Sequence, residues 1–183
     1  MKSGIMDQFN ASDDEQSRSS LLSKQDELSR RLLEVCSTMN RKICCAESLT
    51  GGLLADAFVR IPGASATYRG SINTYAVDTK ASILGVDSTW LDAHGPVNSY
   101  TAEHMATGAL ELFACDGIAL STTGVAGPGP DGNIPAGTVY IGCAVTRGEV
   151  LSRRYLFTGD RELIRYKSVC AAIELALDMC TEN

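Results

Sequence analysis

The sequence is poor in the residues that define several common classes of protein. It has two histidines, one tryptophan and 6% aromatic residues among 183 positions. Lysine and arginine number 16 against 22 acidic residues, the net charge is −6, and no basic stripe appears, so we expect no nucleic-acid partner. No apolar run is long enough to cross a bilayer and no signal-peptide pattern opens the chain, so we expect no membrane association and a cytoplasmic location.

Metal and disulfide motifs are also missing. The seven cysteines are odd in number, lie in apolar runs and show no C-x-x-C spacing. These features favour buried, reduced thiols over a disulfide framework or a zinc site. The carboxylates show no metal-ligand spacing, and we expect neither a metal nor a cofactor.

The composition that is present suits one globular domain, with 44% hydrophobic and 21% charged residues. Residues 1–20 are rich in serine, aspartate, glutamine and asparagine, so we expect a flexible polar tail there and a folded domain over 21–183.

Apolar periodicity predicts strands that alternate with helices early in the chain, followed by two adjacent strands. This order indicates an α/β fold with a mixed, mainly parallel sheet and helices on both faces. We expect a loop-rich stretch around Trp90. The expected strands are about 42–46, 71–77, 117–122, 137–146 and 150–158, and the expected helices about 21–39, 53–60, 78–84, 99–114 and 161–181.

The stretch Cys45-Ala46-Glu47-Ser48-Leu49-Thr50-Gly51-Gly52 lies between an expected strand and an expected helix. A serine at such a turn can cap the helix, or it can serve as a nucleophile close to converging N–H groups. The paired glycines lower helix stability. Close approach of a substrate or tight packing against the sheet would each explain them.

A serine nucleophile needs a base, and the chain offers few. His104 lies inside an expected helix, and His94 lies in a loop without an obvious carboxylate, so a Ser-His-Asp triad is weakly supported. Lys80, five residues after Tyr75, could serve if burial depressed its pKa. The alternative is a solvated lysine at a helix start.

Two further segments can bind an anion. The loop from Thr123 to Gly132 contains several glycines and prolines, and is suited to presenting backbone N–H groups. Arg161 lies at the expected start of the last helix, where the helix dipole favours anions. Arg161 could bind a phosphate, or it could pair with Asp160 or Glu162. No Walker A motif or dinucleotide fingerprint is present.

Taken together, these motifs resemble the CinA C-terminal family, whose stand-alone members are nicotinamide-mononucleotide deamidases. The resemblance covers about Leu28 to the C-terminus. The matching segments occur in family order: 46–52, Gly70 with Tyr75 and Lys80, 123–128, 135–139 and 157–161.

The resemblance implies a three-layer α/β/α sandwich around a mixed five-stranded sheet. It also implies metal-free hydrolysis of the carboxamide of nicotinamide mononucleotide and a homo-oligomer. By position, Ser48 matches the nucleophile, and Tyr75 and Lys80 match the groups that activate it. The substrate-binding positions that we expect are Glu47, Thr50, Gly51, Gly52, Thr123, Gly124, Gly127 and Arg161.

Two other functions remain open from the sequence. One is a non-catalytic nucleotide-binding or stress-linked interaction module on the same fold. The other is an amidase or esterase for a different substrate, which the Ser48, Tyr75 and Lys80 set alone does not exclude.

Overall fold

A five-stranded mixed sheet forms the centre of the molecule in the computed structural model, which describes residues 4–181. The spatial order of the strands is β2-β1-β3-β4-β5. β1 pairs in parallel with β2 and β3, whereas β4 pairs antiparallel with β3 and β5. The strands are β1 Lys42–Glu47, β2 Tyr68–Asn73, β3 Gly117–Gly124, β4 Thr138–Val145 and β5 Val150–Leu156.

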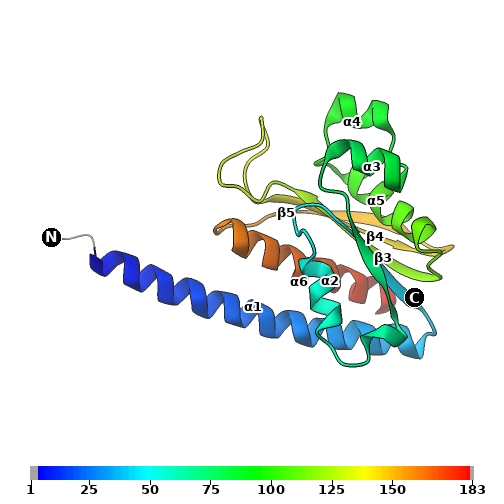
Figure 1. The fold of residues 1–183 in the computed structure, drawn as a ribbon, viewed down its shortest axis with the longest axis horizontal. Helices are drawn as coiled ribbons and strands as arrows, with labels where there is room; N and C mark the ends of the chain where they lie inside the picture. Colours follow the sequence, from blue (N-terminus) through cyan, green and yellow to red (C-terminus); the bar gives the residue numbers. More distant parts are fainter. Residues whose placement is uncertain (1–3, 182–183) are drawn as a thin grey trace.

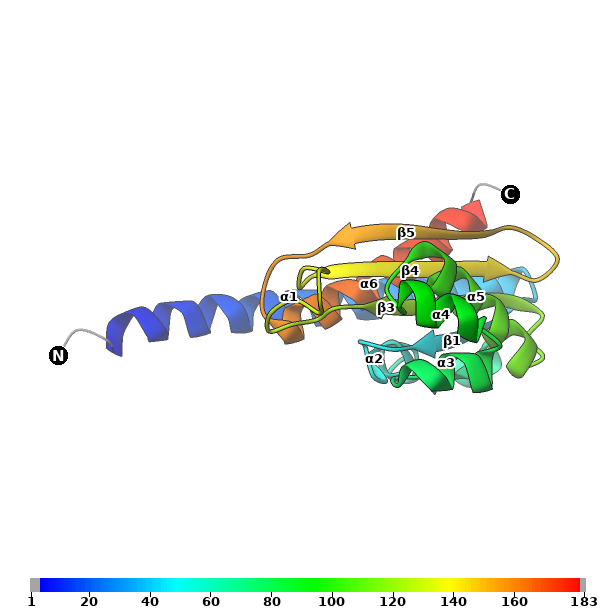
Figure 2. The ribbon, with the colours of Figure 1, turned by 90° about the horizontal axis from the view of Figure 1, so that it is seen from above.

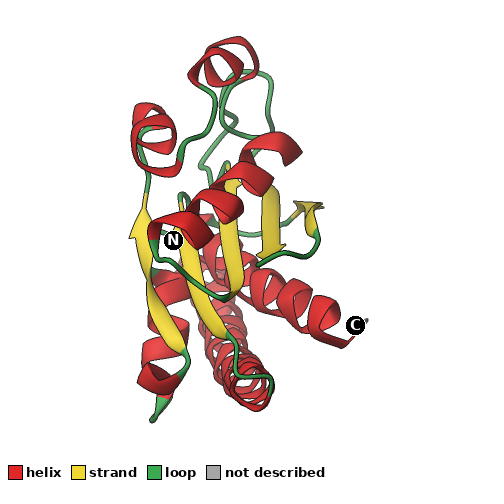
Figure 3. Ribbon diagram, turned by 90° about the vertical axis from the view of Figure 1, so that its right-hand side faces the viewer, coloured by secondary structure: helices red, strands yellow, loops and turns green. Residues whose placement is uncertain are grey.

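Helices cover both faces of this sheet, which gives the three-layer sandwich (Figures 1 and 3). α1, α2 and α6 lie on one face, and α3, α4 and α5 lie on the other. The helices are α1 Gly4–Thr38, α2 Leu53–Val59, α3 Val77–Leu84, α4 Ser88–His94, α5 Ser99–Leu112 and α6 Arg161–Thr181, with a short 3-10 turn η1 at Ala64–Ala66.

The alternation of side chains along β1 feeds two hydrophobic cores, because successive residues of a strand point to opposite faces. Ile43 and Cys45 pack with α1, α2 and α6. Cys44 and Ala46 pack with the helices of the other face. All seven cysteines are free thiols and six are buried, which confirms the expectation of buried, reduced thiols.

The first helix differs from the sequence expectation. It begins at Gly4 rather than near Leu21, so the part of the expected flexible tail that the structure describes is helical. Its first turns project beyond the other elements (Figure 2). Arg18 supports this longer helix by pairing with Asp160 at 2.8 Å and with Glu162 at 3.2 Å at the start of α6.

Two smaller expectations also need correction. The stretch around Trp90 contains α4, which Asp87 caps by accepting from the N–H groups of Thr89 and Trp90. β2 lies earlier than expected and ends at Asn73, so Tyr75 follows the strand instead of belonging to it.

Among residues 4–181, no helix combines the length and the apolar character that crossing a membrane requires.

Candidate active site

Ser48 lies in the turn between β1 and α2, at the edge where the three parallel strands end. Its backbone N–H donates to the carbonyl oxygen of Thr122 on β3 over 3.0 Å. The hydroxyls of Thr50 and Thr122 share a further hydrogen bond of 2.8 Å. Both bonds hold the turn against the central strand. The Ser48 residue is 9% exposed, and it lines a small cavity at this edge of the sheet.

Glu47, and not Ser48, caps α2. The fully buried Glu47 carboxylate accepts a hydrogen bond of 2.7 Å from the Ser71 hydroxyl. It also accepts bonds of 2.9 to 3.0 Å from three backbone N–H groups, those of Gly52, Leu54 and Ala55. The partial positive charge at a helix N-terminus favours a carboxylate there. Glu47 is not among the described residues that line the cavity, and its hydrogen bonds are to the turn and to the start of α2.

The two glycines of the turn have a conformational explanation. Gly51 has a φ of +57° and Gly52 a φ of +101°, a region that glycine adopts far more readily than other residues. Neither glycine is among the described residues that line the cavity, and neither is Thr50, which is fully buried. These three residues shape the turn, whose cavity-lining members are Ser48 and Leu49.

Lys80 is the residue that the structure brings to Ser48. It lies in the first turn of α3, is 1% exposed, and donates from Nζ to Ser48 Oγ over 3.1 Å. A second hydrogen bond runs from Nζ to the carbonyl oxygen of Thr74. Among the ion pairs of the described residues, none involves Lys80. Burial lowers the pKa of Lys80 to about 8. The alternative of a solvated lysine is therefore wrong.

Tyr75 does not join this pair. Its side chain is 63% exposed, and its hydroxyl accepts a hydrogen bond of 3.1 Å from Nη2 of Arg161. Within the described part of the chain, no hydrogen bond links Tyr75 to Ser48 or Lys80. Tyr75 does line the same cavity. The structure thus places Tyr75 with Arg161 at the cavity mouth, whereas the sequence suggested a tyrosine–lysine pair.

Arg161 is held by backbone and tyrosine, not by carboxylates. Its Nη1 donates to the carbonyl oxygen of Gly127 over 2.7 Å. The acidic neighbours that could have paired with Arg161 pair with Arg18 instead. Among the described residues Arg161 has no ion pair, so its charge remains available to an anion in the cavity that it lines.

The glycine-rich loop after β3 contributes part of the cavity wall. Thr123 and Gly124 line it, and the Thr123 hydroxyl donates to the carbonyl oxygen of Pro96 over 2.7 Å. A Cβ at Gly124 would come within 2.6 Å of the Thr138 carbonyl oxygen, so close strand packing also requires glycine there. Gly127 is not among the described lining residues and acts through Arg161.

The cavity around Ser48 has a volume of about 190 Å³. A nucleophile candidate, a buried lysine and an exposed arginine therefore share one small space at the carboxyl ends of parallel strands, where ligands of open α/β sheets bind. It is lined by Ser48, Leu49, Tyr75, Val77, Lys80, Pro96, Val97, Thr123, Gly124, Ala126, Asp131 and Arg161.

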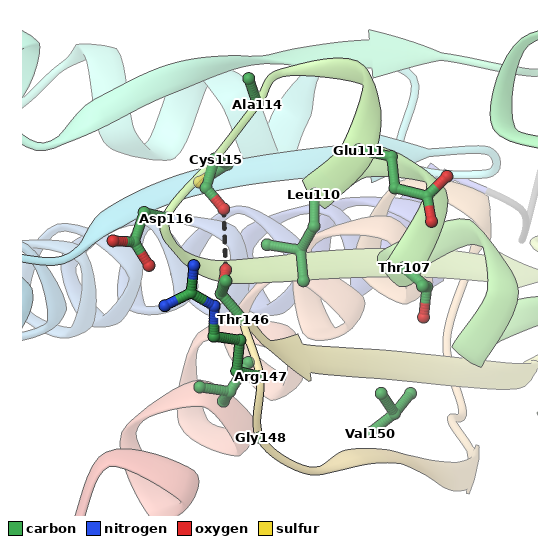
Figure 4. Close-up of a pocket in the computed structure, with 11 residues that line it drawn as sticks. Thr107, Leu110, Glu111, Ala114, Cys115, Asp116, Thr146, Arg147, Gly148 and Val150 are labelled. Carbon is green, nitrogen blue, oxygen red and sulfur yellow. Dashed lines mark hydrogen bonds between the residues drawn. The ribbon is translucent and has the colours of Figure 1, made fainter.

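A larger cavity of about 510 Å³ lies elsewhere, between the end of α5 and the β4–β5 turn (Figure 4). Cys115 precedes β3, and its carbonyl oxygen accepts a bond of 2.8 Å from the Thr146 hydroxyl. Because β3 starts at this edge, the cavity is at the opposite end of the strand from Ser48. Its size alone does not make it the functional site.

Sequence reasoning missed two residues of the Ser48 region. Asp131 lines the cavity from the glycine-rich loop. Arg165 donates to the carbonyl oxygens of Leu49 and Thr50, and so bonds the turn that carries Ser48. The spacing of Arg165 four residues after Arg161 places both on one side of α6, and this spacing could have identified it.

The fold and the site define a three-layer α/β protein with a serine and a buried lysine at the carboxyl edge of its sheet. The model of the CinA C-terminal domain family matches residues 25–180. The chain belongs to this family.

Relatives carry different names. A "CinA-like protein" of Frankia casuarinae is 43% identical over 154 residues, which is 84% of this chain and 35% of the relative. A "nicotinamide-nucleotide amidohydrolase PncC" of Enterobacter agglomerans is 38% identical over 142 residues, 77% of this chain and 86% of the relative. The chain spans about a third of the length of several curated relatives that it matches, the Frankia protein among them.

Solved structures agree with the fold. The competence/damage inducible protein CihA from Agrobacterium tumefaciens matches with a TM-score of 0.81 and 34% identity, covering 85% of this chain and 95% of that one. A CinA superfamily protein from Klebsiella pneumoniae matches with a TM-score of 0.82 and 31% identity, and the match covers 87% of this chain and 99% of that one.

Proposed function

We propose that the protein hydrolyses the carboxamide of nicotinamide mononucleotide to nicotinic acid mononucleotide and ammonia. The observation that carries this proposal is the 3.1 Å hydrogen bond between Lys80 Nζ and Ser48 Oγ in a buried setting. A relative named nicotinamide-nucleotide amidohydrolase, which the chain matches over 86% of its length, supports the choice of substrate.

In the proposed reaction neutral Lys80 takes the proton of Ser48 while Oγ attacks the carboxamide carbon. The lysine then passes this proton to the amide nitrogen, and ammonia leaves an acyl–Ser48 ester. Water attacks the ester carbon as Lys80 accepts a proton from it, and the carboxylic acid departs with Ser48 restored. With a pKa of about 8, Lys80 is neutral in about a tenth of molecules at pH 7.

The negative charge that develops on the carboxamide oxygen needs hydrogen-bond donors. Among residues 4–181, the backbone N–H groups of Leu49 and Thr50 have no hydrogen-bond acceptor. They adjoin Ser48, and we assign them to the oxyanion. Arg161, steadied by Tyr75 and Gly127, binds the phosphate of the substrate.

The two other candidate functions have less support. A buried lysine without a carboxylate partner costs stability, and a module that only binds a nucleotide has no need for it. An amidase for a neutral substrate would have no use for the unpaired charge of Arg161. We keep the second alternative as an outcome of the test.

The test measures ammonia release from nicotinamide mononucleotide, nicotinamide riboside and nicotinamide by the wild type and by Arg161→Ala. We expect turnover of the mononucleotide to be strongly preferred by the wild type, and this preference to shrink in the variant. Equal turnover of the mononucleotide and the riboside by the wild type would show that the phosphate is not recognised. No turnover of any of the three compounds would contradict the proposal.

A further inference from the structure

Arg165 is a cation bonded to the turn that carries Ser48. From α6, its Nε donates to the carbonyl oxygen of Leu49 over 2.9 Å, and its Nη2 donates to that of Thr50 over 2.6 Å. The side chain is partly buried. Among the ion pairs of the described residues, none involves Arg165. Its charge is therefore directed at two backbone carbonyls.

The same turn holds two buried N–H groups without an acceptor. Leu49 is 4% exposed and Thr50 is fully buried, yet in the described structure neither N–H has an acceptor. An unpaired buried N–H is rare because it loses its hydrogen bond to water. The other N–H groups of the turn have acceptors. The N–H of Ser48 donates to the Thr122 carbonyl and that of Gly51 to the Ser48 carbonyl. The N–H of Gly52 donates to the Glu47 carboxylate. Leu49 lines the Ser48 cavity and Thr50 follows it in the turn, so the two remaining donors lie next to the place where a substrate oxygen would bind.

Arg165 acts on one of these donors through a single peptide group. The carbonyl of Leu49 and the N–H of Thr50 belong to the same planar unit. A cation bonded to the oxygen draws electron density from the nitrogen, which makes the N–H a stronger donor, as in any chain of hydrogen bonds. The bond to Thr50 fixes the next peptide, so the orientation of the donor is fixed from both sides.

We propose, on the basis of the nucleophilic role proposed above for Ser48, that Arg165 is a positioning residue which orients and polarises the Leu49–Thr50 peptide as an oxyanion donor. In the described structure no hydrogen bond links Arg165 to the serine hydroxyl or to Lys80. Gly51 lies beside this arginine: a Cβ there would make an ordinary van der Waals contact of 3.4 Å with Arg165 Nη2, so it is the positive φ that favours glycine at this position.

The test uses the covalent reaction of Ser48 with a fluorophosphonate probe, which does not depend on the natural substrate. Ser48 Oγ attacks phosphorus, fluoride leaves, and the serine proton passes to Lys80. The charge that builds up on the phosphoryl oxygen needs the same donors as the carboxamide oxygen. The rate constant of labelling is measured by intact-protein mass spectrometry for the wild type, Arg165→Ala, Arg165→Lys and the control Arg153→Gln. Arg153 pairs with Asp178 and is not among the described residues that line the Ser48 cavity.

We expect Arg165→Ala to lower the labelling rate constant about 10- to 100-fold, less than the roughly 100- to 1000-fold loss when an oxyanion donor is removed, because the N–H is weakened and not deleted. Arg165→Lys retains the charge and one donor, so its labelling rate constant should lie between those of Arg165→Ala and the wild type. Millimolar guanidinium should partly restore the rate of Arg165→Ala. The midpoint of the pH dependence, set by Lys80, should stay near 8 in every variant.

Three results would overturn the proposal: wild-type labelling rates in Arg165→Ala, the same loss in Arg153→Gln, or a loss that comes with a displaced pH midpoint and no rescue by guanidinium. If Arg165→Ala does not fold, Arg165→Lys decides by the same criteria. A wild type that labels at Ser48 but releases no ammonia from nicotinamide mononucleotide would contradict the proposed substrate and leave the role of Arg165 intact. A wild type that does not label at Ser48 would contradict both proposals.

Discussion

Lys80 donates a hydrogen bond to Ser48 across 3.1 Å, between two residues that lie 32 positions apart in the chain. The strand order explains the contact, because β1 and β2 are parallel neighbours and end at the same edge. No carboxylate bonds either side chain within the described structure. The properties expected of the site therefore follow from a buried lysine and not from a histidine.

The first prediction concerns the pH dependence of turnover. Lys80 accepts the serine proton only when it is neutral, and burial lowers its pKa to about 8. We expect kcat/KM to rise with pH, to reach half of its maximum near pH 8 and to level off above it. Initial rates of ammonia release between pH 6 and 10 would measure this. A profile that is flat, or that falls over this interval, would be inconsistent with Lys80 as the base.

The second prediction concerns stability. Lys80 titrates at about 8 in the folded state and at 10.5 in the unfolded state, so between these values the unfolded chain binds more protons. The contribution of Lys80 to the free energy of unfolding is therefore least favourable below pH 8, and it should increase by about 3 kcal/mol as pH rises to 10.5.

Urea unfolding of the wild type and of Lys80→Met at pH 7 and pH 10 isolates this change. The difference in free energy of unfolding should shift in favour of the wild type at the higher pH. Lys42→Met is the control, because Lys42 also donates to a backbone carbonyl, that of Ala66, but through a solvent-exposed hydrogen bond. Equal shifts in both variants would rule out a special environment for Lys80.

The third prediction separates substrate binding from activation of the serine. Arg161→Ala removes a charged donor and should raise KM for the mononucleotide about 10- to 100-fold with a smaller effect on kcat. Tyr75→Phe removes only a hydroxyl that bonds Arg161, so KM should rise a few-fold while kcat stays close to the wild type. Steady-state kinetics decide. A large fall in kcat for Tyr75→Phe would restore the tyrosine to the role that the sequence suggested.

The fourth prediction tests the assignment of Glu47 to structure. Glu47→Gln places an amide NH₂ group among donors, so we expect a loss of about 1 to 3 kcal/mol in the free energy of unfolding. Glu174→Gln is the matched control, since Glu174 forms an exposed pair with Lys24 that should contribute less than about 1 kcal/mol. Chemical denaturation measures both. Similar losses in the two variants would contradict the capping role.

Local patterns in the sequence were sufficient for most of the fold. The expected last helix coincides with α6, because its apolar spacing and the Asp160 cap are local features. The extension of α1 to Gly4 was missed because its support comes from Arg18 and the start of α6, far along the chain. A polar stretch gives no local indication of such a partner.

The site was predicted less completely for the same physical reason. Ser48, Lys80 and Arg161 could be proposed from residue type and position at element ends. The spacing of Arg165 from Arg161 indicates only that both lie on one side of a helix, and it does not indicate the hydrogen bond of Arg165 to the Thr50 carbonyl, 115 positions earlier. The hydrogen bonds of Glu47 could not be predicted, because a carboxylate beside a nucleophile candidate gives no indication, in sequence, of whether it faces a cavity or a helix end.

The most direct measurement is the parallel time course of ammonia and nicotinic acid mononucleotide formed from nicotinamide mononucleotide by the wild type and by Ser48→Ala. We expect the wild type to form both products in equal amounts, and Ser48→Ala to reduce the rate by at least about a thousandfold while it still folds with an unchanged melting temperature. Equal rates in the two proteins, or a folded wild type that forms neither product, would contradict the account.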